Sequence, residues 1–477
     1  MQTNLFSITE TTNVLPPKNE REKLLQRFLD KLVLNPHLTR SLVSFQENKN
    51  EPFYRWLKYK EGFSSKLVQF FLDHYKAESE TPLRILDPFA GTGTTVTTAI
   101  NKGHLATGIE LMPVGTAAMR ARLCADTVHL ENFQKYYHHF LDYSFTGEVS
   151  EKYRFKHLNI TGNAFPEETE KKIAQYLEFV DHIHDEEVKY LFWFACLTIL
   201  EEVSFTSKDG QYLRWDLRSN RKLKSQYQKR HIEKFTIAIK NKLEVIYHDL
   251  KKRNGNKFHD KAKIIEGSCL DELMIFPSDS IDVVITSPPY CNRYDYTRTY
   301  ALELAFLGFD ELAVKNLRQA LLTATVENKS KKELMKQKYA EISRLDFHER
   351  CVDVFNNQKA LQEVLGLLYE AQSNGLLNNK NIPNMVENYF YEMNFLIQEM
   401  GRIVSADGRI YMVNDNVQYN GTEVPVDLIL SEFARSAGFA IDTIWILPRG
   451  KGNSSQQMGA FGRTEIRKCV YVWSKVN

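Results

Sequence analysis

The sequence RILDPFAGTGTTVTTAI, residues 84–100, sets the fold class of this chain. Its first residues form an apolar run that predicts a short buried strand, and a Gly-rich turn follows. A helix is predicted to open near Thr94 and Thr95. The next run, HLATGIE at 104–110, predicts a second buried strand that ends in Glu110. Strand, turn, helix and strand in this order begin a doubly wound α/β sheet.

Further apolar and β-branched runs continue this alternation along the chain. They predict strands at residues 263–267, 281–286, 408–415, 439–447 and 468–474. The expected fold is therefore α/β, a doubly wound Rossmann-like sheet of seven strands with helical insertions, in which the last two strands form an antiparallel pair.

The predicted core is interrupted twice. An N-terminal arm with short helices is expected at 1–50 and the first part of the core, with a ligand site, at 51–123. A helical, basic insertion follows at 124–262, then core with a second polar loop at 263–309. A second helical insertion is expected at 310–380, and the C-terminal part of the core at 381–477.

Composition excludes several classes of protein. The 477 residues carry a net charge of only +2, and the six cysteines form no CxxC pair, so no zinc site, other metal site or redox motif is expected. The N-terminus lacks a basic start followed by an apolar core, and the most apolar stretch, residues 190–200, is too short to cross a bilayer. We expect a cytoplasmic protein without a membrane segment.

The Gly-rich turn is a candidate ligand loop. Gly91 and Gly93 allow the backbone to turn tightly, and the following helix N-terminus offers free N–H groups. Glu110, at the end of the next strand, is placed to accept hydrogen bonds from ribose hydroxyls. A nucleoside triphosphate is disfavoured because no Lys-Ser/Thr follows the last glycine, and a dinucleotide because Val96 replaces the third glycine. S-adenosylmethionine fits best; a purely structural turn is the alternative.

The motif Thr286-Ser287-Pro288-Pro289-Tyr290 follows the strand at 281–286 and is the most specific signal in the chain. Two prolines hold an extended turn at the carboxyl end of the strand, where ligands bind in open α/β sheets. Ser287 and the Pro288 carbonyl can accept the two hydrogens of an exocyclic amine and stabilise its developing charge. The Tyr290 ring can stack on an extruded base. The alternative is an ordinary Pro-Pro loop with a surface tyrosine.

These two motifs resemble those of the DNA amino-methyltransferases, the N4-cytosine/N6-adenine family. The Ser form of SPPY is the one that cytosine-N4 members mostly use, and no Pro-Cys pair of the carbon-5 enzymes occurs. The cofactor loop precedes the catalytic loop, and segments 204–219, 287–309 and 452–463 resemble a bacterial branch of the family. The resemblance implies S-adenosylmethionine as cofactor and double-stranded DNA, with base flipping, as substrate. It also implies a restriction-modification or phage-defence setting, with a restriction endonuclease or defence partner.

The resemblance adds residues 59–64, YKEGFS, beside the methionine end of the cofactor, and Ser268 where many members have an acid that contacts adenine. The expected catalytic residues are Ser287, Pro288, Pro289 and Tyr290. The expected cofactor-binding residues are Lys60, Gly62, Phe63, Asp87, Pro88, Phe89, Gly91, Gly93, Thr94, Thr95, Glu110 and Ser268.

Residues 208–263 form a candidate DNA-binding region. They hold 17 Lys and Arg against 6 Asp and Glu, a net charge of +11, while the rest of the chain is net acidic. A solvated helical face is the alternative. The expected DNA-binding residues are Tyr212, Arg214, Trp215, Arg218, Arg221, Lys222, Lys224, Lys251, Lys252, Arg253, Arg293 and Arg298.

The sequence thus predicts a site-specific DNA methyltransferase that acts on an exocyclic amino group, with cytosine N4 favoured. Adenine N6 is the alternative target. A nicotinamide oxidoreductase leaves SPPY unexplained, and a non-catalytic DNA-recognition subunit with a methylase fold leaves both intact motifs unexplained.

Overall fold

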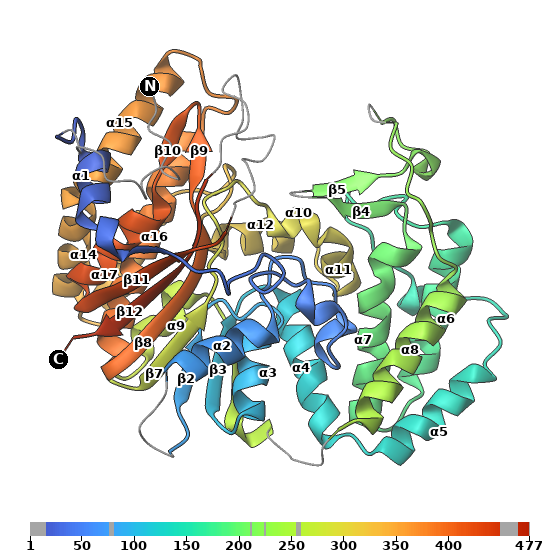
Figure 1. Cartoon of the computed structure of the whole chain (residues 1–477). Helices are drawn as coiled ribbons and strands as arrows, with labels where there is room; N and C mark the ends of the chain where they lie inside the picture. The colour runs from blue at the N-terminus through green and yellow to red at the C-terminus, as the bar shows by residue number, and fades with distance from the viewer. Residues whose placement is uncertain are drawn as a thin grey trace.

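A computed structural model of the chain describes residues 16–75, 81–209, 212–223, 226–253, 259–448 and 466–476. The strands are β1 (Leu32–Leu34), β2 (Arg84–Asp87), β3 (Leu105–Glu110), β4 (Thr206–Asp209), β5 (Tyr212–Trp215), β6 (Ala262–Glu266), β7 (Ile281–Thr286), β8 (Val404–Asp415), β9 (Val417–Tyr419), β10 (Thr422–Val424), β11 (Phe439–Ile446) and β12 (Lys468–Lys475). Eight of them form one sheet in the order β1-β11-β12-β8-β7-β2-β3-β6 (Figure 1).

The α-helices are α1 (Glu20–Arg27), α2 (Ser65–Tyr75), α3 (Thr94–Asn101), α4 (Pro113–Thr127), α5 (Leu130–Leu141), α6 (Glu167–Asp181), α7 (Glu186–Val203), α8 (Phe235–Lys251), α9 (Cys269–Ile275), α10 (Tyr296–Thr299), α11 (Ala301–Phe306), α12 (Glu311–Ala320), α13 (Lys332–Glu341), α14 (Leu345–Asn357), α15 (Lys359–Ser373), α16 (Ile382–Ile403) and α17 (Val426–Ser436). Short 3-10 helices are η2 (Leu29–Lys31), η3 (Glu47–Lys49), η4 (Tyr54–Trp56), η5 (Glu151–Tyr153), η6 (Leu217–Ser219) and η7 (His259–Lys261).

The sheet separates two helical layers. Ile85 of β2 packs among α2 and α3, whereas the next residue, Leu86, faces the cluster formed by α9 and α16. This alternation follows from the two-residue period of a strand, and burial on both faces explains why β2 and β7 are apolar runs rather than alternating ones.

The strand order reverses between β2 and β7. From β2 the chain winds outward through β3 to β6, and it then returns to place β7 and β8 on the other side of β2, all parallel. Such a reversal opens a crevice at the carboxyl ends of the two central strands. The motifs at residues 87–95 and 286–290 both begin there.

The predicted α/β class and the final antiparallel pair, β11 with β12, are confirmed. The predicted strand count is wrong, because the sheet has eight strands rather than seven. The extra strand, β1, lies in the predicted N-terminal arm, and its Leu32 and Leu34 pair in parallel with Ile444 and Ile446 of β11. Sequence periodicity could not predict β1 because the strand has only three residues. Its pairing covers the edge of β11, which would otherwise be exposed.

The region between β3 and β6 is built mainly of the helices α4 to α8, and it also contains the hairpin of β4 and β5. The helices pack around Phe133, Phe192 and Leu243 in a core that also includes Leu302 and Leu304 of α11. Figure 1 shows the hairpin beside α10 and α11, on the side of the molecule where the central strands end. The hairpin escaped prediction because each strand has only four residues and no clear alternation.

The described residues contain neither a membrane-spanning helix nor a cluster of metal ligands. Within the described ranges no helix is long and apolar enough to cross a membrane. Nor do three or more His, Cys, Asp or Glu side chains converge on a possible metal position among those residues. Five of the six cysteines are buried, and all six are free thiols.

Candidate active site

The two sequence motifs meet at the carboxyl edge of the sheet. Ile85 and Leu86 of β2 pair with Val283 and Val284 of β7, so both strands deliver their loops to the same edge. The Thr286 hydroxyl donates a hydrogen bond of 2.7 Å to Asp87 Oδ1. This contact joins the Gly-rich loop to the SPPY loop directly.

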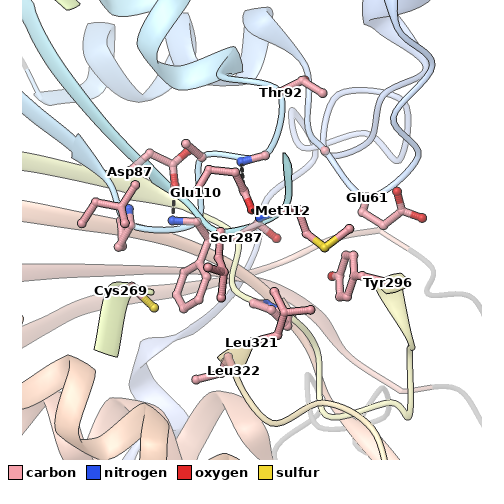
Figure 2. A pocket seen from close by; sticks show the side chains of 18 of the residues that line it. Glu61, Asp87, Thr92, Glu110, Met112, Cys269, Ser287, Tyr296, Leu321 and Leu322 are labelled. Carbon is pink, nitrogen blue, oxygen red and sulfur yellow. Dashed lines mark hydrogen bonds between the residues drawn. The ribbon is translucent and has the colours of Figure 1, made fainter. Parts of the chain in front are cut away.

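A pocket of about 750 Å³, including its solvent-filled mouth, lies between these loops. Figure 2 shows Asp87, Glu110 and Ser287 along one part of its wall and Glu61 with Tyr296 at another. The pocket is lined by Tyr59, Glu61, Gly62, Phe63, Asp87, Pro88, Phe89, Ala90, Gly91, Thr92, Thr94, Ile109, Glu110, Leu111, Met112, Gly267, Ser268, Cys269, Ser287, Pro289, Tyr296, Leu321 and Leu322.

Asp87 is a buried carboxylate at the end of β2. Besides the Thr286 hydroxyl, its Oδ1 accepts the backbone N–H of Phe89 at 3.1 Å. Burial raises the pKa of Asp87 to about 6, and its hydrogen bonds oppose that rise only in part. A cationic ligand in the pocket would favour the ionised form.

Glu110 holds the Gly-rich loop against the start of α4. Its Oε2 accepts the N–H of Gly91 and its Oε1 accepts the N–H of Met112, both at 2.6 Å. Burial raises the pKa of Glu110 to about 7. Each carboxylate oxygen can accept more than one hydrogen bond, so the side chain retains acceptor capacity toward the pocket.

Two glycines are required by this close packing. Gly93 has φ +75° and caps α3, and a Cβ on it would lie 2.4 Å from Met119 Cγ. Gly115 of α4 approaches the loop so closely that a Cβ would lie 2.4 Å from the carbonyl oxygen of Gly91. The helix and the loop can meet only because both positions lack side chains.

Most of the expected cofactor-binding residues line the pocket, but three do not. Lys60 is exposed, and its Nζ donates to the backbone carbonyl of Lys208. Gly93 packs against Met119, and the buried Thr95 hydroxyl donates to the carbonyl of Ile285 at 3.2 Å. Gly93 and Thr95 therefore support the wall from behind, whereas Lys60 contacts the hairpin strand β4. Those on the wall are Gly62, Phe63, Asp87, Pro88, Phe89, Gly91, Thr94, Glu110 and Ser268.

Of the expected catalytic residues, Ser287 and Pro289 line the pocket. The Ser287 hydroxyl lies 3.4 Å from the Tyr290 hydroxyl, to which it can donate. Pro288 is buried and Tyr290 is half-buried, outside the set of pocket-lining residues. Lys468 Nζ lies 5.7 Å from the centre of the Tyr290 ring.

Sequence reasoning missed Glu61, although it lies inside the motif YKEGFS. Its carboxylate accepts hydrogen bonds from the hydroxyls of Tyr294 and, at 2.5 Å, Tyr300. The neighbouring Tyr59 also lines the pocket, as does Tyr296 from α10. The density of tyrosines in residues 290–300 was the available signal.

Four further lining residues carry no local signal in the sequence. Leu321 and Leu322 come from the segment after α12, Met112 directly precedes α4, and Cys269 is the first residue of α9. They are ordinary apolar side chains, and only the fold brings them to the pocket.

Several cations expected to bind DNA are engaged within the protein. Arg218 forms an ion pair of 2.7 Å with Asp216, and Arg221 donates to the Gly162 carbonyl at 2.7 Å. The Arg221 guanidinium also lies 4.1 Å from the Trp215 ring, which packs against the core of the insertion. These side chains build the insertion itself.

Arg253 and its neighbours lie far from the pocket. Arg253 Nη1 donates to the carbonyls of Ala125 and Val128, at 2.5 and 3.1 Å, at the C-terminal end of α4. Since α4 begins beside the pocket and has 15 residues, this end is about 22 Å away. Lys251 and Lys252 are exposed at the same end. A base in the pocket and a phosphate at Arg253 would therefore be about 22 Å apart, so these three residues lie outside the immediate surroundings of the pocket.

The remaining expected DNA contacts fall into two groups. Arg214 and Lys222 are exposed on the insertion, and the Arg214 guanidinium lies 4.1 Å from the Tyr227 ring. Arg298 is exposed and pairs with Glu327 at 3.0 Å, whereas Arg293, at φ +69°, donates to Asn378. The Tyr212 side chain, Lys224 and the loop at 452–463 lie outside the described residues.

The charges on the pocket wall identify the kind of ligand it suits. Glu61, Asp87 and Glu110 are acidic, and no Lys or Arg is among the pocket-lining residues of the described chain. A phosphate-bearing ligand would meet three carboxylates without a compensating cation. A ligand with ribose hydroxyls, an ammonium group and a sulfonium matches the acceptors, so the residues present fit S-adenosylmethionine.

Comparison with known proteins gives one consistent result. The chain is 42% identical over 460 residues to the type II methyltransferase M.AvaI of Nostoc sp. (strain PCC 7120 / SAG 25.82 / UTEX 2576), covering 95% of this chain and 92% of the relative. The M.AvaI protein of Anabaena variabilis gives the same values. Identity to the type II methyltransferase M.BsoBI of Geobacillus stearothermophilus is 37% over 483 residues, covering 97% and 93%. No protein-family model matches the chain, and no solved structure matches it significantly.

Proposed function

Because this chain belongs to the type II methyltransferases, we propose that it is an S-adenosylmethionine-dependent, site-specific DNA methyltransferase of a restriction-modification system, acting on cytosine N4. One observation carries the proposal. Asp87 and Ser287, from two different motifs, line one pocket whose charged side chains are all acidic. A cognate restriction endonuclease would be its partner in the cell.

Five side chains of the pocket would hold the cofactor. Glu110 would accept hydrogen bonds from its ribose hydroxyls, as expected for an acid at the end of the second strand. Glu61, fixed by two tyrosine hydroxyls, would accept its ammonium group. Phe89, Cys269 and Leu322 supply apolar wall for the adenine ring. When bound, the cofactor supplies a methyl group activated by a sulfonium.

Ser287 would act on the target amine. An exocyclic amine is a weak nucleophile because its lone pair is delocalised into the ring. The Ser287 hydroxyl oxygen can accept one of its hydrogens and thereby stabilise the positive charge that develops on nitrogen. The Pro288 carbonyl would accept the second hydrogen, and Tyr290 would stack on the extruded base.

The choice of cytosine N4 rests on the Ser form of the SPPY motif. The same acceptors could grip the amine of adenine, whose alternative product is N6-methyladenine. Nucleoside analysis of DNA from cells that express the chain separates the two products directly, and N4-methylcytosine is expected.

The proposed DNA surface lies around the β4–β5 hairpin. β5 packs beside α10, which contributes Tyr296 to the pocket. The exposed Arg214 and Lys222 of this part of the insertion could neutralise phosphates while the target base enters. Arg298 at the end of α10 could do so as well.

The test measures methyl transfer and cofactor binding in the same variants. Ser287→Ala should lower the rate of transfer from labelled cofactor to DNA about 10²–10³-fold, because it removes one oriented acceptor. Cofactor affinity, measured by calorimetry without DNA, should stay near wild type. Tyr290→Ala should behave in the same way, and the exposed Ser373→Ala is the matched control. Transfer near the wild-type rate in both loop variants would refute the assignment.

A further inference from the structure

A lysine and a glutamate are buried together between the hairpin and the catalytic loop. Lys208 of β4 pairs with Glu303 of α11, with Nζ 2.5 Å from Oε1, and their side chains are only 4% and 2% exposed. The residues are 95 positions apart in the chain. The pair therefore fastens the helical insertion to the segment that follows SPPY.

Stability alone does not explain this pair. Taking two charges out of water costs much of what their attraction returns, and an apolar pair of similar volume is often as stable. The second oxygen of Glu303 is buried without a hydrogen-bond partner in the described chain. Burial raises the pKa of Glu303, and Lys208 opposes that rise. Glu303 thus depends on Lys208 staying in place.

The pair continues toward the pocket through one aromatic ring. Lys208 Nζ lies 4.2 Å from the centre of the Tyr300 ring. That ring stacks on Tyr59 at 5.0 Å with an angle of 19°, and its hydroxyl donates to Glu61 at 2.5 Å. Tyr59 and Glu61 both line the pocket. Lys208 is therefore linked to the pocket wall through a single residue, Tyr300.

The pair is also tied to the outer face of the hairpin. In the antiparallel register Lys208 pairs with Leu213, and both side chains are buried, whereas the next pair holds the exposed Arg214. The N–H of Lys208 donates to Glu201 at 2.9 Å, and its carbonyl accepts from Lys60. Arg214 follows Leu213 directly in β5, so a ligand held by Arg214 on one face lies one residue from the strand pair that contains Lys208 on the other face.

We propose that Lys208 and Glu303 are positioning residues that couple the seating of the β4–β5 hairpin on DNA to the Glu61 end of the cofactor pocket. The proposal rests on the proposed function, because it takes DNA as the ligand of the hairpin. Coupling between two sites is reciprocal, so DNA should tighten cofactor binding by the same factor by which cofactor tightens DNA binding.

The experiment measures the dissociation constant of S-adenosylhomocysteine, which keeps the amino-acid end of the cofactor but has no methyl group to transfer. The measurement is made by calorimetry, without and with a DNA duplex that the wild-type enzyme methylates. The ratio of the two constants is the coupling. We expect a ratio of about fivefold or more for the wild type, which is the lower range of such effects. Lys208→Met and Glu303→Gln should bring the ratio close to one.

Tyr300→Phe separates coupling from folding. It keeps the buried ring and the Lys208–Glu303 pair but removes the hydroxyl that donates to Glu61. Its ratio should also fall close to one while its affinity for DNA without cofactor stays at the wild-type value. Lys152→Met, which breaks an exposed pair with Asp181 in the same insertion, is the control and should keep the wild-type ratio.

The outcomes distinguish this inference from the proposed function. A wild-type enzyme that methylates no DNA refutes the proposed function before the coupling is measured. A wild type that methylates DNA but has a ratio of one, or a Tyr300→Phe variant with the wild-type ratio, overturns the coupling and leaves the proposed function standing. Should Lys208→Met fail to fold, Tyr300→Phe still decides.

Discussion

Two charged regions of this molecule obey different rules. At the carboxyl edge of the sheet, Asp87 and Glu110 are buried and bound to neighbouring backbone amides, and both face the pocket. In the basic insertion, Arg221 and Arg253 instead donate hydrogen bonds to backbone carbonyls of the insertion and of α4. A short motif at a strand end therefore predicted which side chains line the pocket, because the motif also fixes the backbone that carries them, whereas a charge count over fifty residues did not show which cations are already engaged within the protein.

The largest effect is expected at the contact between α4 and the Gly-rich loop, whose close packing places Glu110 beside the pocket. Gly115→Ala should lower the free energy of unfolding by about 3 kcal/mol, since the new Cβ would lie 2.4 Å from the Gly91 carbonyl oxygen, a rigid backbone atom. Urea denaturation measures the change. Gly366→Ala, in the exposed middle of α15 with open space around it, should instead stabilise by about 0.5–1 kcal/mol. Equal effects at both positions would contradict the packing described.

The insertion gives the second test, because Arg253 is structural while its neighbour is not. Arg253→Ala should cost about 2 kcal/mol of unfolding free energy, since two carbonyls at the end of α4 lose a charged donor. DNA affinity should not change. The exposed Lys252→Ala is the matched variant and should leave both quantities unaltered. A selective loss of DNA binding in Arg253→Ala would restore the charge-count interpretation.

The third prediction is an about tenfold change in cofactor affinity when Glu110 titrates. Its pKa is raised to about 7, and ribose hydroxyls need the carboxylate as acceptor, so cofactor affinity should fall about tenfold from pH 8 to pH 6. The stability of the free protein should change in the opposite direction, because a buried acid with a raised pKa loses stability as the pH rises through about 7. Calorimetry over this range is the measurement. Glu110→Gln, which cannot titrate, should bind more weakly and lose most of this slope, since only Asp87, with a pKa of about 6, then titrates in the pocket. A tenfold slope that persists would assign the titration to another group.

The smallest effect concerns a single exposed cation. Lys222→Ala should weaken DNA binding only a few-fold and lower the slope of log K against log salt by about one. Lys251→Ala, at the end of α8 far from the pocket, should leave the slope unchanged. Fluorescence anisotropy at several salt concentrations measures both. If both variants lower the slope equally, DNA contacts the insertion as far as Lys251 and not only near the hairpin.

The sequence by itself determined the α/β class, the order of the two motifs and their arrival at one edge of the sheet. These features depend on local causes: buried β-branched runs form strands, glycines at 91 and 93 allow one turn, and two prolines fix another. Ser287 and Glu110 could be named from the chain because their strands place them.

Only the tertiary structure decided which charges are available and what completes the pocket. Glu61 with its tyrosines, Leu321, the pair of Lys208 with Glu303 and the edge strand β1 all join parts of the chain that are distant in sequence. Burial and partner choice at such positions follow from how helices and strands pack, and no periodicity or composition along the chain records that packing.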